Sequence, residues 1–252
     1  MTKGKSSRLN LHFLANPARF LRFTSRIFPW ALGVSLTTIV AGLILGLGVV
    51  PPDYQQGDAY RIIFVHVPSA WMGLFIYAVM AFSSAAAIIW RHPLAYVISK
   101  TSAPIGACFT FICLLTGSLW GQPMWATWWV WDARLTSMLV LLFLYIGYIA
   151  LNSAFQDPNK GYRASSILVL VGVINLPIVK FSVDWWNTLH QPETISKIDS
   201  PSIDSSMIAP LLLMIVGCMA YYISTLIIRV RSEILERRIR KMRLEQTGKI
   251  NE

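Results

Sequence analysis

Residues 62–90 read IIFVHVPSAWMGLFIYAVMAFSSAAAIIW and contain no Asp, Glu, Lys or Arg. About 20 apolar residues are enough for a helix to cross the hydrocarbon core of a bilayer. A backbone in lipid has to satisfy its own hydrogen bonds, and a helix does so within one segment. This stretch therefore predicts a membrane-spanning helix.

The rest of the chain repeats this pattern. Of its 252 residues, 55% are hydrophobic and only 13% are charged, whereas soluble domains have roughly a quarter charged residues. The long uncharged stretches are residues 29–50, 62–90, 101–120, 135–155, 164–179 and 207–228. The fifth is the shortest and ends before Lys180. We predict an all-α polytopic membrane protein with six transmembrane helices.

The basic residues predict the orientation of these helices. Eighteen of the 22 Lys and Arg residues lie before residue 29, after residue 228, or in the second and fourth connections. Cytoplasmic loops are enriched in Lys and Arg, so both termini are predicted to be cytoplasmic. We divide the chain into a basic N-terminal segment (1–28), a membrane domain (29–228) and a basic tail (229–252). Positive charge that is confined to the cytoplasmic segments is explained by the topology and does not indicate binding to nucleic acid. The basic tail is interpreted mainly as a topology signal, or as a helix that lies along anionic lipid or a docking surface for a cytoplasmic partner.

The predicted outer loop between helices three and four is rich in tryptophan. Residues 120–136 read WGQPMWATWWVWDARLT, and we call residues 120–131 the Trp-rich segment. Pro123 fits the first turn of a short interfacial helix. On such a helix one face would contain Trp125, Trp128, Trp129 and Asp132. Tryptophan is also common at membrane interfaces, so an aromatic belt and a platform for a flat ligand both explain the composition.

Two of the four histidines fall on the predicted outer side. His66 lies at the outer end of the second helix, and His190 lies in the fifth loop, in SVDWWNTLHQP. A histidine more often packs or forms hydrogen bonds than binds a metal. Here, however, a pair flanks the Trp-rich segment, and two neutral imidazoles can bind haem iron axially. Arg61 and Arg134 are candidates to meet the haem carboxylates, or they anchor the helices at the interface.

Other functions account for less of the pattern. A membrane electron carrier of the cytochrome b type needs histidine pairs inside its helices. A transporter that moves its substrate through its own helices usually has polar residues at mid-membrane, where Asn175 is the main candidate. The chain contains no phosphate-binding GxxxxGK[ST] loop, so it cannot hydrolyse ATP by that route, and no CxxCH motif for covalent haem attachment.

Residues 120–136, WGQPMWATWWVWDARLT, resemble the "WWD" signature of the cytochrome c assembly family. The resemblance extends through DYQQGDAYRIIFVHVPSAW, APIGACFTFICLLTGSLWG and WWNTLHQ, and covers residues 29–228. The chain length matches the short, six-helix, haem-handling branch rather than the longer branch that acts at haem attachment. This resemblance implies a multi-pass protein of the bacterial inner membrane with a periplasmic site for haem b.

The resemblance also implies partners and residue roles. The expected partners are the haem chaperone CcmE and the subunits CcmA, CcmB and CcmD. The chain would be a haem-binding and delivery subunit of an ABC-type complex, not an enzyme. His66 and His190 would be the axial ligands of haem iron. The residues of the haem platform or chaperone-binding surface would be Trp120, Gly121, Pro123, Trp125, Trp128, Trp129, Trp131 and Asp132.

Overall fold

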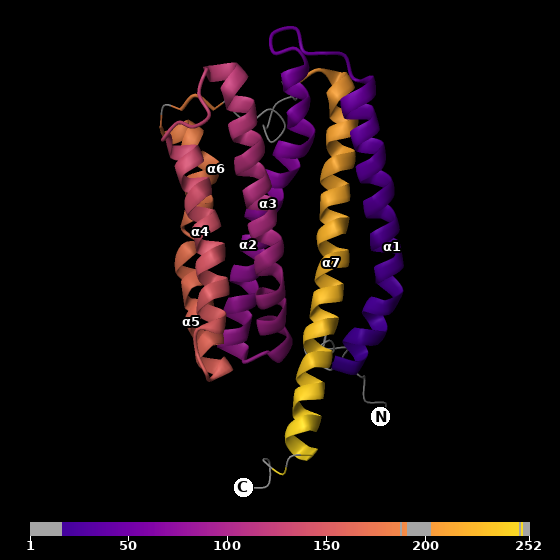
Figure 1. Ribbon diagram of the computed structural model, residues 1–252, viewed down its shortest axis with the longest axis vertical. Coiled ribbons are helices and arrows are strands. Elements are labelled where there is room, and N and C mark those ends of the chain that lie inside the picture. The colour runs from indigo at the N-terminus through magenta and orange to yellow at the C-terminus, as the bar shows by residue number, and fades with distance from the viewer. Residues whose placement is uncertain (1–16, 187, 191–202, 247, 249–252) are drawn as a thin grey trace, which may run out of the picture.

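The computed structural model describes residues 17–186, 188–190, 203–246 and 248. This part of the chain is helical and contains no strand. Six segments are long and apolar enough to cross a membrane, which confirms the predicted number of spans. They form one bundle in which the start of α1 and the end of α7 lie at the same end (Figure 1).

The first four spans lie where the apolar stretches predict them, and α1 and α3 are longer than their stretches. α1 already begins at residue 17, so Pro29 is inside the helix. A short π-helical turn, η2, follows it, and a 3-10 turn, η3, precedes α2. The bounds are α1 Pro17–Ile44, η2 Leu45–Val49, η3 Asp58–Ile62, α2 Ile63–Trp90, α3 Pro93–Trp125 and α4 Ala133–Ser153.

The fifth span consists of two helices. α5 (Pro158–Gly172) and α6 (Asn175–Trp185) follow one another and together form a single membrane-spanning segment, 158–185. The span is thus longer than the apolar stretch 164–179, because α5 includes the polar turn before that stretch and α6 continues through Lys180. The amide of Asn175, at the start of α6, donates to the Ser137 carbonyl of α4 at 2.9 Å. Asn175 therefore makes the helix–helix bond that is the ordinary role of such a residue.

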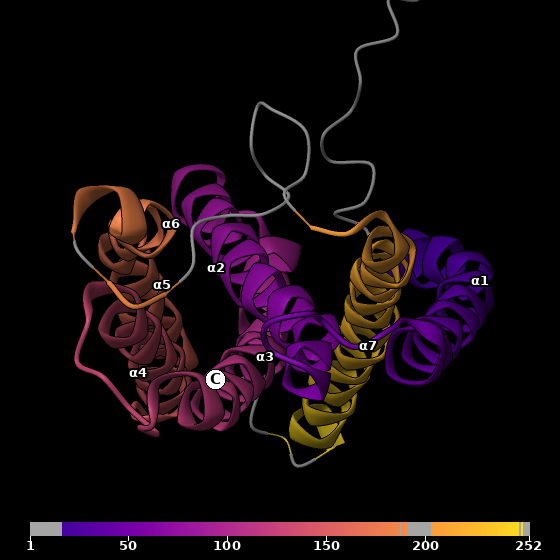
Figure 2. The same cartoon turned by 90° about the horizontal axis from the view of Figure 1, so that it is seen from above.

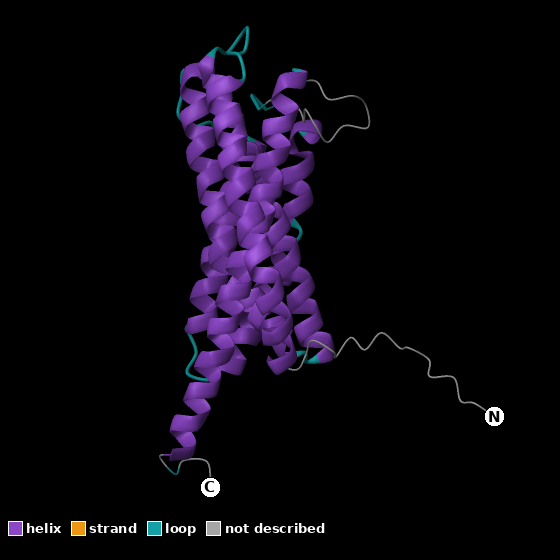
Figure 3. Cartoon of the chain, turned by 90° about the vertical axis from the view of Figure 1, so that its right-hand side faces the viewer, coloured by secondary structure: helices purple, strands orange, loops and turns teal. Residues whose placement is uncertain are grey.

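The last helix, α7 (Ser205–Gln246), continues well beyond its apolar part (Figure 3). A polar cluster connects its extension to the bundle. Glu233 accepts from Lys100 of α3 at 2.7 Å and from Arg237 at 2.9 Å. Arg237 also donates to the Tyr162 hydroxyl of α5 at 2.8 Å. The first part of the predicted basic tail is therefore a helical continuation of the sixth span.

The helices form two groups on either side of a central pair, α2 and α3: one group is α4, α5 and α6, and the other is α1 and α7. α2 and α3 pack closely against each other, α4 packs on α3, α5 and α6, and α1 packs almost entirely on α7 (Figure 2). Gly217 permits the α1–α7 contact, because a Cβ there would lie 2.5 Å from Ile39 of α1. Buried hydroxyls join each group to the central pair: Tyr145 of α4 donates to the Gly73 carbonyl of α2 at 2.7 Å, and the hydroxyls of Ser102 on α3 and Tyr222 on α7 lie 2.9 Å apart.

Candidate functional site: a histidine pair in a tryptophan-walled cavity

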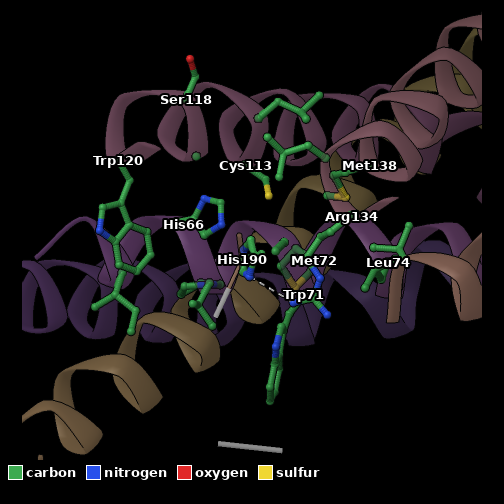
Figure 4. Close-up of a pocket in the computed structure, with 18 of the residues that line it drawn as sticks. His66, Trp71, Met72, Leu74, Cys113, Ser118, Trp120, Arg134, Met138 and His190 are labelled. Atoms are coloured by element: carbon green, nitrogen blue, oxygen red, sulfur yellow. Dashed lines mark hydrogen bonds between the residues drawn. The ribbon is translucent and has the colours of Figure 1, made fainter. Parts of the chain in front are cut away.

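The two histidines singled out by the sequence meet at the end of the bundle opposite the start of α1 and the end of α7. His66 lies near the start of α2 and is 8% exposed. His190 follows α6, and its backbone N–H donates to Thr188 Oγ1 at 3.0 Å, which forms a local turn. Their ring centres are 6.2 Å apart and their planes are tilted by 32°. Figure 4 shows both imidazoles in one cavity.

Aromatic side chains surround His66 on the side of η3 and α3. The Trp120 indole and the imidazole form a T-shaped contact with a ring-centre distance of 5.8 Å. Trp120 makes a similar contact with Tyr60 of η3 at 5.7 Å. The indole N–H donates to Gln56 Oε1 at 2.9 Å, so this partly buried polar atom is satisfied. Trp120 is therefore held in place from two sides.

Arg134 connects α4, α6 and the His190 turn. Its Nε donates to Ser182 Oγ at 3.2 Å and its Nη2 to the Lys180 carbonyl at 3.1 Å. Nη1 lies 3.5 Å from His190 Nδ1, a long contact that Figure 4 marks with a dashed line. Arg61 points elsewhere: it binds Asp58 at 2.8 Å and the carbonyls of η2, outside the cavity lining.

The cavity between these elements has a volume of about 500 Å³ and is lined by α2, α3, α4, α6 and α7. This volume is within the range of small-molecule and cofactor sites, roughly 300–1,000 Å³. Its walls are mostly apolar. The aromatic and sulfur-containing side chains that line it are Tyr60, Trp71, Met72, Phe75, Cys113, Trp120, Met124, Trp125, Trp129, Met138 and Met219. Arg134 and Lys180 are the charged residues of the lining, and no carboxylate is among its described members.

The Trp-rich segment does not form the short helix that we predicted from Pro123. α3 instead continues through Pro123 to Trp125 and ends where Ala126 adopts a left-handed conformation at φ 56°. A non-helical stretch follows as far as Asp132, whose carboxylate caps α4 by accepting from Leu135 N–H at 2.7 Å. Proline is tolerated near either end of a helix, so its presence alone does not tell the first turn of a new helix from the last turn of the preceding one.

The platform residues consequently divide into two sets. Trp120, Trp125 and Trp129 line the cavity. Trp128 and Trp131 are 58% and 75% exposed and are not part of the lining. Ser118 Oγ of α3 donates to the Trp128 carbonyl at 2.8 Å, which holds the non-helical stretch against α3. Within the stretch, Thr127 Oγ1 donates to the Trp129 carbonyl at 3.1 Å.

The remaining residues of the signature support this stretch. Gly121 is buried beneath it, and a Cβ there would lie 3.2 Å from the Thr127 carbonyl oxygen. Pro123 is exposed. Within the described part of the chain, two buried polar atoms here lack a hydrogen-bond partner: the indole nitrogen of Trp129 and Oδ2 of Asp132. Buried polar atoms are nearly always bonded, so such atoms suit a site that receives a ligand or a partner.

Several residues that belong to the site were not predicted from the sequence. Lys180 counted only as an outer-loop charge, yet α6 continues past it and it lines the cavity. Thr116 lies in an apolar stretch of α3, but its hydroxyl is 3.0 Å from His66 Nδ1. Lys180 directly follows the predicted fifth span, and its charge at that boundary is the signal that could have been used, because charged residues within membrane segments are usually functional.

The fold and the site define a polytopic helical membrane protein with a bis-histidine, tryptophan-walled cavity at one end of its bundle. Among known proteins, the family described as CcmC, heme exporter protein C, matches residues 10–245. The chain belongs to this family, which confirms the resemblance seen in the sequence.

Individual relatives agree with this assignment. Heme exporter protein C of Bradyrhizobium diazoefficiens is 48% identical over 94% of this chain and 90% of its own length. That of Escherichia coli strain K12 is 49% identical over 89% of this chain and 91% of its own length. A putative cytochrome c biosynthesis ccmC-like mitochondrial protein of Marchantia polymorpha is 46% identical over 79% of this chain and 85% of its length.

Proposed function

We propose that this protein binds haem b between His66 and His190 on the outer face of the bacterial inner membrane. It presents the haem to the haem chaperone CcmE during cytochrome c maturation. The observation that carries the proposal is the histidine pair, with ring centres 6.2 Å apart in one aromatic cavity. The names of the relatives, heme exporter protein C, support the same cargo.

The spacing of the pair suits a single iron atom. An imidazole nitrogen lies about 2 Å from the metal that it binds, and the ring centre lies roughly 1 Å further away. Two rings on opposite sides of one iron therefore have centres about 6 Å apart. Among the described residues, no group of three or more His, Cys, Asp and Glu side chains could bind a bare metal ion. Haem iron needs only two ligands from the protein, because the macrocycle supplies the others.

The charges of the cavity suit the carboxylates of haem. Arg134 and Lys180 line it, and the described lining contains no acidic side chain that would repel an anionic cargo. Of the two arginines that we expected to meet the carboxylates, Arg134 is therefore the better candidate. Arg61 already binds Asp58 and two carbonyls of η2. The apolar walls exclude water from the haem macrocycle, while Arg134 and Lys180 orient the haem edge that has the carboxylates.

Presentation requires a surface that the chaperone can reach. Trp128 and Trp131 lie beside the cavity and are more than half exposed. We assign these two side chains to chaperone docking, and Trp120, Trp125 and Trp129 to the haem. The site faces the periplasm in this proposal because eighteen of the 22 basic residues belong to the termini and to the two connections at the other side.

Energy for release has to come from partners. The sequence lacks a phosphate-binding loop, so we propose that the chain is a delivery subunit that works with CcmA, CcmB and CcmD rather than an enzyme. The alternative is a transporter that moves haem through its own helices. It has less support, because Asn175, its main polar candidate, is already bonded to Ser137.

Absorption spectroscopy of the purified, detergent-solubilised protein tests the proposal. The wild type reconstituted with haem is expected to show a low-spin bis-histidine spectrum. His66→Ala and His190→Ala should each lose this spectrum, and His92→Ala, in the connection between α2 and α3, should keep it. If both site variants bind haem like the wild type, the histidine pair does not bind the iron, and the Trp-rich segment is better explained as a docking surface for a protein.

A further inference from the structure

The hydroxyl of Thr116 lies in the middle of a short hydrogen-bond chain. Thr116 is on α3, one helical turn before Trp120. Its Oγ1 is 3.0 Å from His66 Nδ1 on α2. The same oxygen is 2.7 Å from the Ile112 carbonyl oxygen and 3.1 Å from that of Cys113. One oxygen thus contacts an imidazole nitrogen and two acceptors.

Counting protons assigns the direction of each bond. A hydroxyl has one proton to donate, and a carbonyl can only accept. Thr116 Oγ1 is only 2.7 Å from the Ile112 carbonyl oxygen, and two oxygens this close repel unless a proton lies between them, so the Thr116 proton is donated to the α3 backbone and its lone pair faces His66. Nδ1 of His66 must then be the donor. A neutral imidazole has only one N–H, so the lone pair of His66 is on Nε2.

We propose that Thr116 is a positioning residue that keeps His66 protonated at Nδ1 and leaves Nε2 as the nitrogen that binds iron. The assignment of iron rests on the proposed function; the assignment of the tautomer does not. Metal-binding histidines usually donate their other N–H to a fixed acceptor, which orients the ring and makes the ligand nitrogen more basic. A threonine hydroxyl that donates its own proton to a backbone carbonyl is such an acceptor.

Gly117 permits this contact. A Cβ at position 117 would lie 3.0 Å from Cε1 of His66 and 3.5 Å from Nδ1. Because glycine has no side chain, the imidazole can lie directly against α3 and within reach of the Thr116 hydroxyl. Trp120 contacts the same ring one turn further along. Residues of a single helix therefore fix both the place and the protonation of His66 before any cargo arrives.

Haem titration separates positioning from packing. Thr116→Val replaces the hydroxyl with a methyl group and should weaken haem affinity by about 10- to 100-fold, the usual effect of losing such a bond. It should also raise the reduction potential of the bound haem, because a less basic imidazole stabilises ferric iron less. Thr116→Ser retains the hydroxyl and should behave as the wild type does. Thr101→Val is the matched control: Thr101 is on the same helix and makes the same bond to its own backbone, to Val97 at 2.7 Å.

The tautomer is measured without haem. Protein labelled with ¹⁵N-histidine reports by NMR which ring nitrogen has the proton, and His66→Gln identifies the signal. Wild type and Thr116→Ser should show His66 protonated at Nδ1, and Thr116→Val should show a mixture. An unchanged tautomer in Thr116→Val would overturn the proposal, as would an equal loss of haem affinity in Thr101→Val. If the wild type binds no haem, the proposed function fails, while the NMR result still decides the role of Thr116.

Discussion

Replacing Arg134 with lysine should weaken haem binding even though the positive charge is retained. The guanidinium reaches three groups at once: Ser182 Oγ, the Lys180 carbonyl and His190 Nδ1. A guanidinium has a rigid fork of donors, whereas an ammonium group is a compact charge on a flexible stem. Lysine at position 134 therefore cannot bridge α6 and the His190 turn in the same way.

The size of the effect follows from the distances. The 3.5 Å contact with His190 is too long to contribute much, and the bonds of 3.2 and 3.1 Å to α6 are the ones that count. A hydrogen bond to a charged group stabilises by about 1.5–3 kcal/mol. Lysine can form one of these two bonds, so the variant should lose about 1.5–3 kcal/mol. If this loss falls on the assembled site, haem affinity drops by roughly 10- to 100-fold.

Titrating haem into the purified protein and following the absorption change measures this affinity. Arg134→Gln, which also removes the charge that we assign to a haem carboxylate, should bind more weakly than Arg134→Lys. Arg163→Lys, an exposed arginine on α5 near the other end of the bundle, is the matched control and should have no effect. Wild-type affinity in Arg134→Lys would refute the bridging role, and equal affinities in the two Arg134 variants would refute the contact with a carboxylate.

Three further predictions test other parts of the site. Trp129→Ala should weaken haem binding by removing a wall of the cavity, whereas Trp131→Ala should keep haem binding and lower the yield of co-purified CcmE; identical behaviour of the two would contradict the division of the Trp-rich segment. Asp132→Ala should destabilise the protein by about 0.5–2 kcal/mol through loss of the α4 cap, while Asp132→Asn, which still caps, should unfold thermally like the wild type. Lys180→Ala should reduce affinity for haem but not for haem dimethyl ester, which has no free carboxylates; an equal loss with both ligands would exclude a charge interaction.

The number of spans was readable from the sequence because lipid imposes a length and a composition on each of them. The ends of the helices were harder to predict from the sequence. α1 begins at residue 17 and α7 continues to residue 246, since polar residues can extend a helix beyond the apolar core of the membrane. The break between α5 and α6 lies inside an apolar stretch, where hydropathy contains no information about it.

The site was predictable wherever its chemistry belongs to particular residue types. Histidine and clustered tryptophan are rare enough that His66 and the Trp-rich segment stand out in an apolar chain. The local conformation of that segment was wrong in the prediction, because Pro123 lies in the last turn of α3 instead of the first turn of a new helix. Arg61 and Arg134 are equivalent by sequence, and only the contacts of Arg61 with Asp58 and η2 distinguish them.

Thr116 and Gly117 illustrate why the other residues of the candidate site could not be predicted from the sequence. Threonine and glycine are common in membrane helices, where they usually permit close packing and hydrogen bonds between helices. Here they do both for one imidazole: glycine removes the atom that would collide with the ring, and the neighbouring hydroxyl orders its proton. The effect depends on α2 and α3 packing side by side in one register, since a different rotation of either helix would separate the same residues. Periodicity predicts which face of a helix is apolar, but not which residue of another helix it meets. The histidine is therefore visible in the sequence, while the residues that contact it become visible only in the packed bundle.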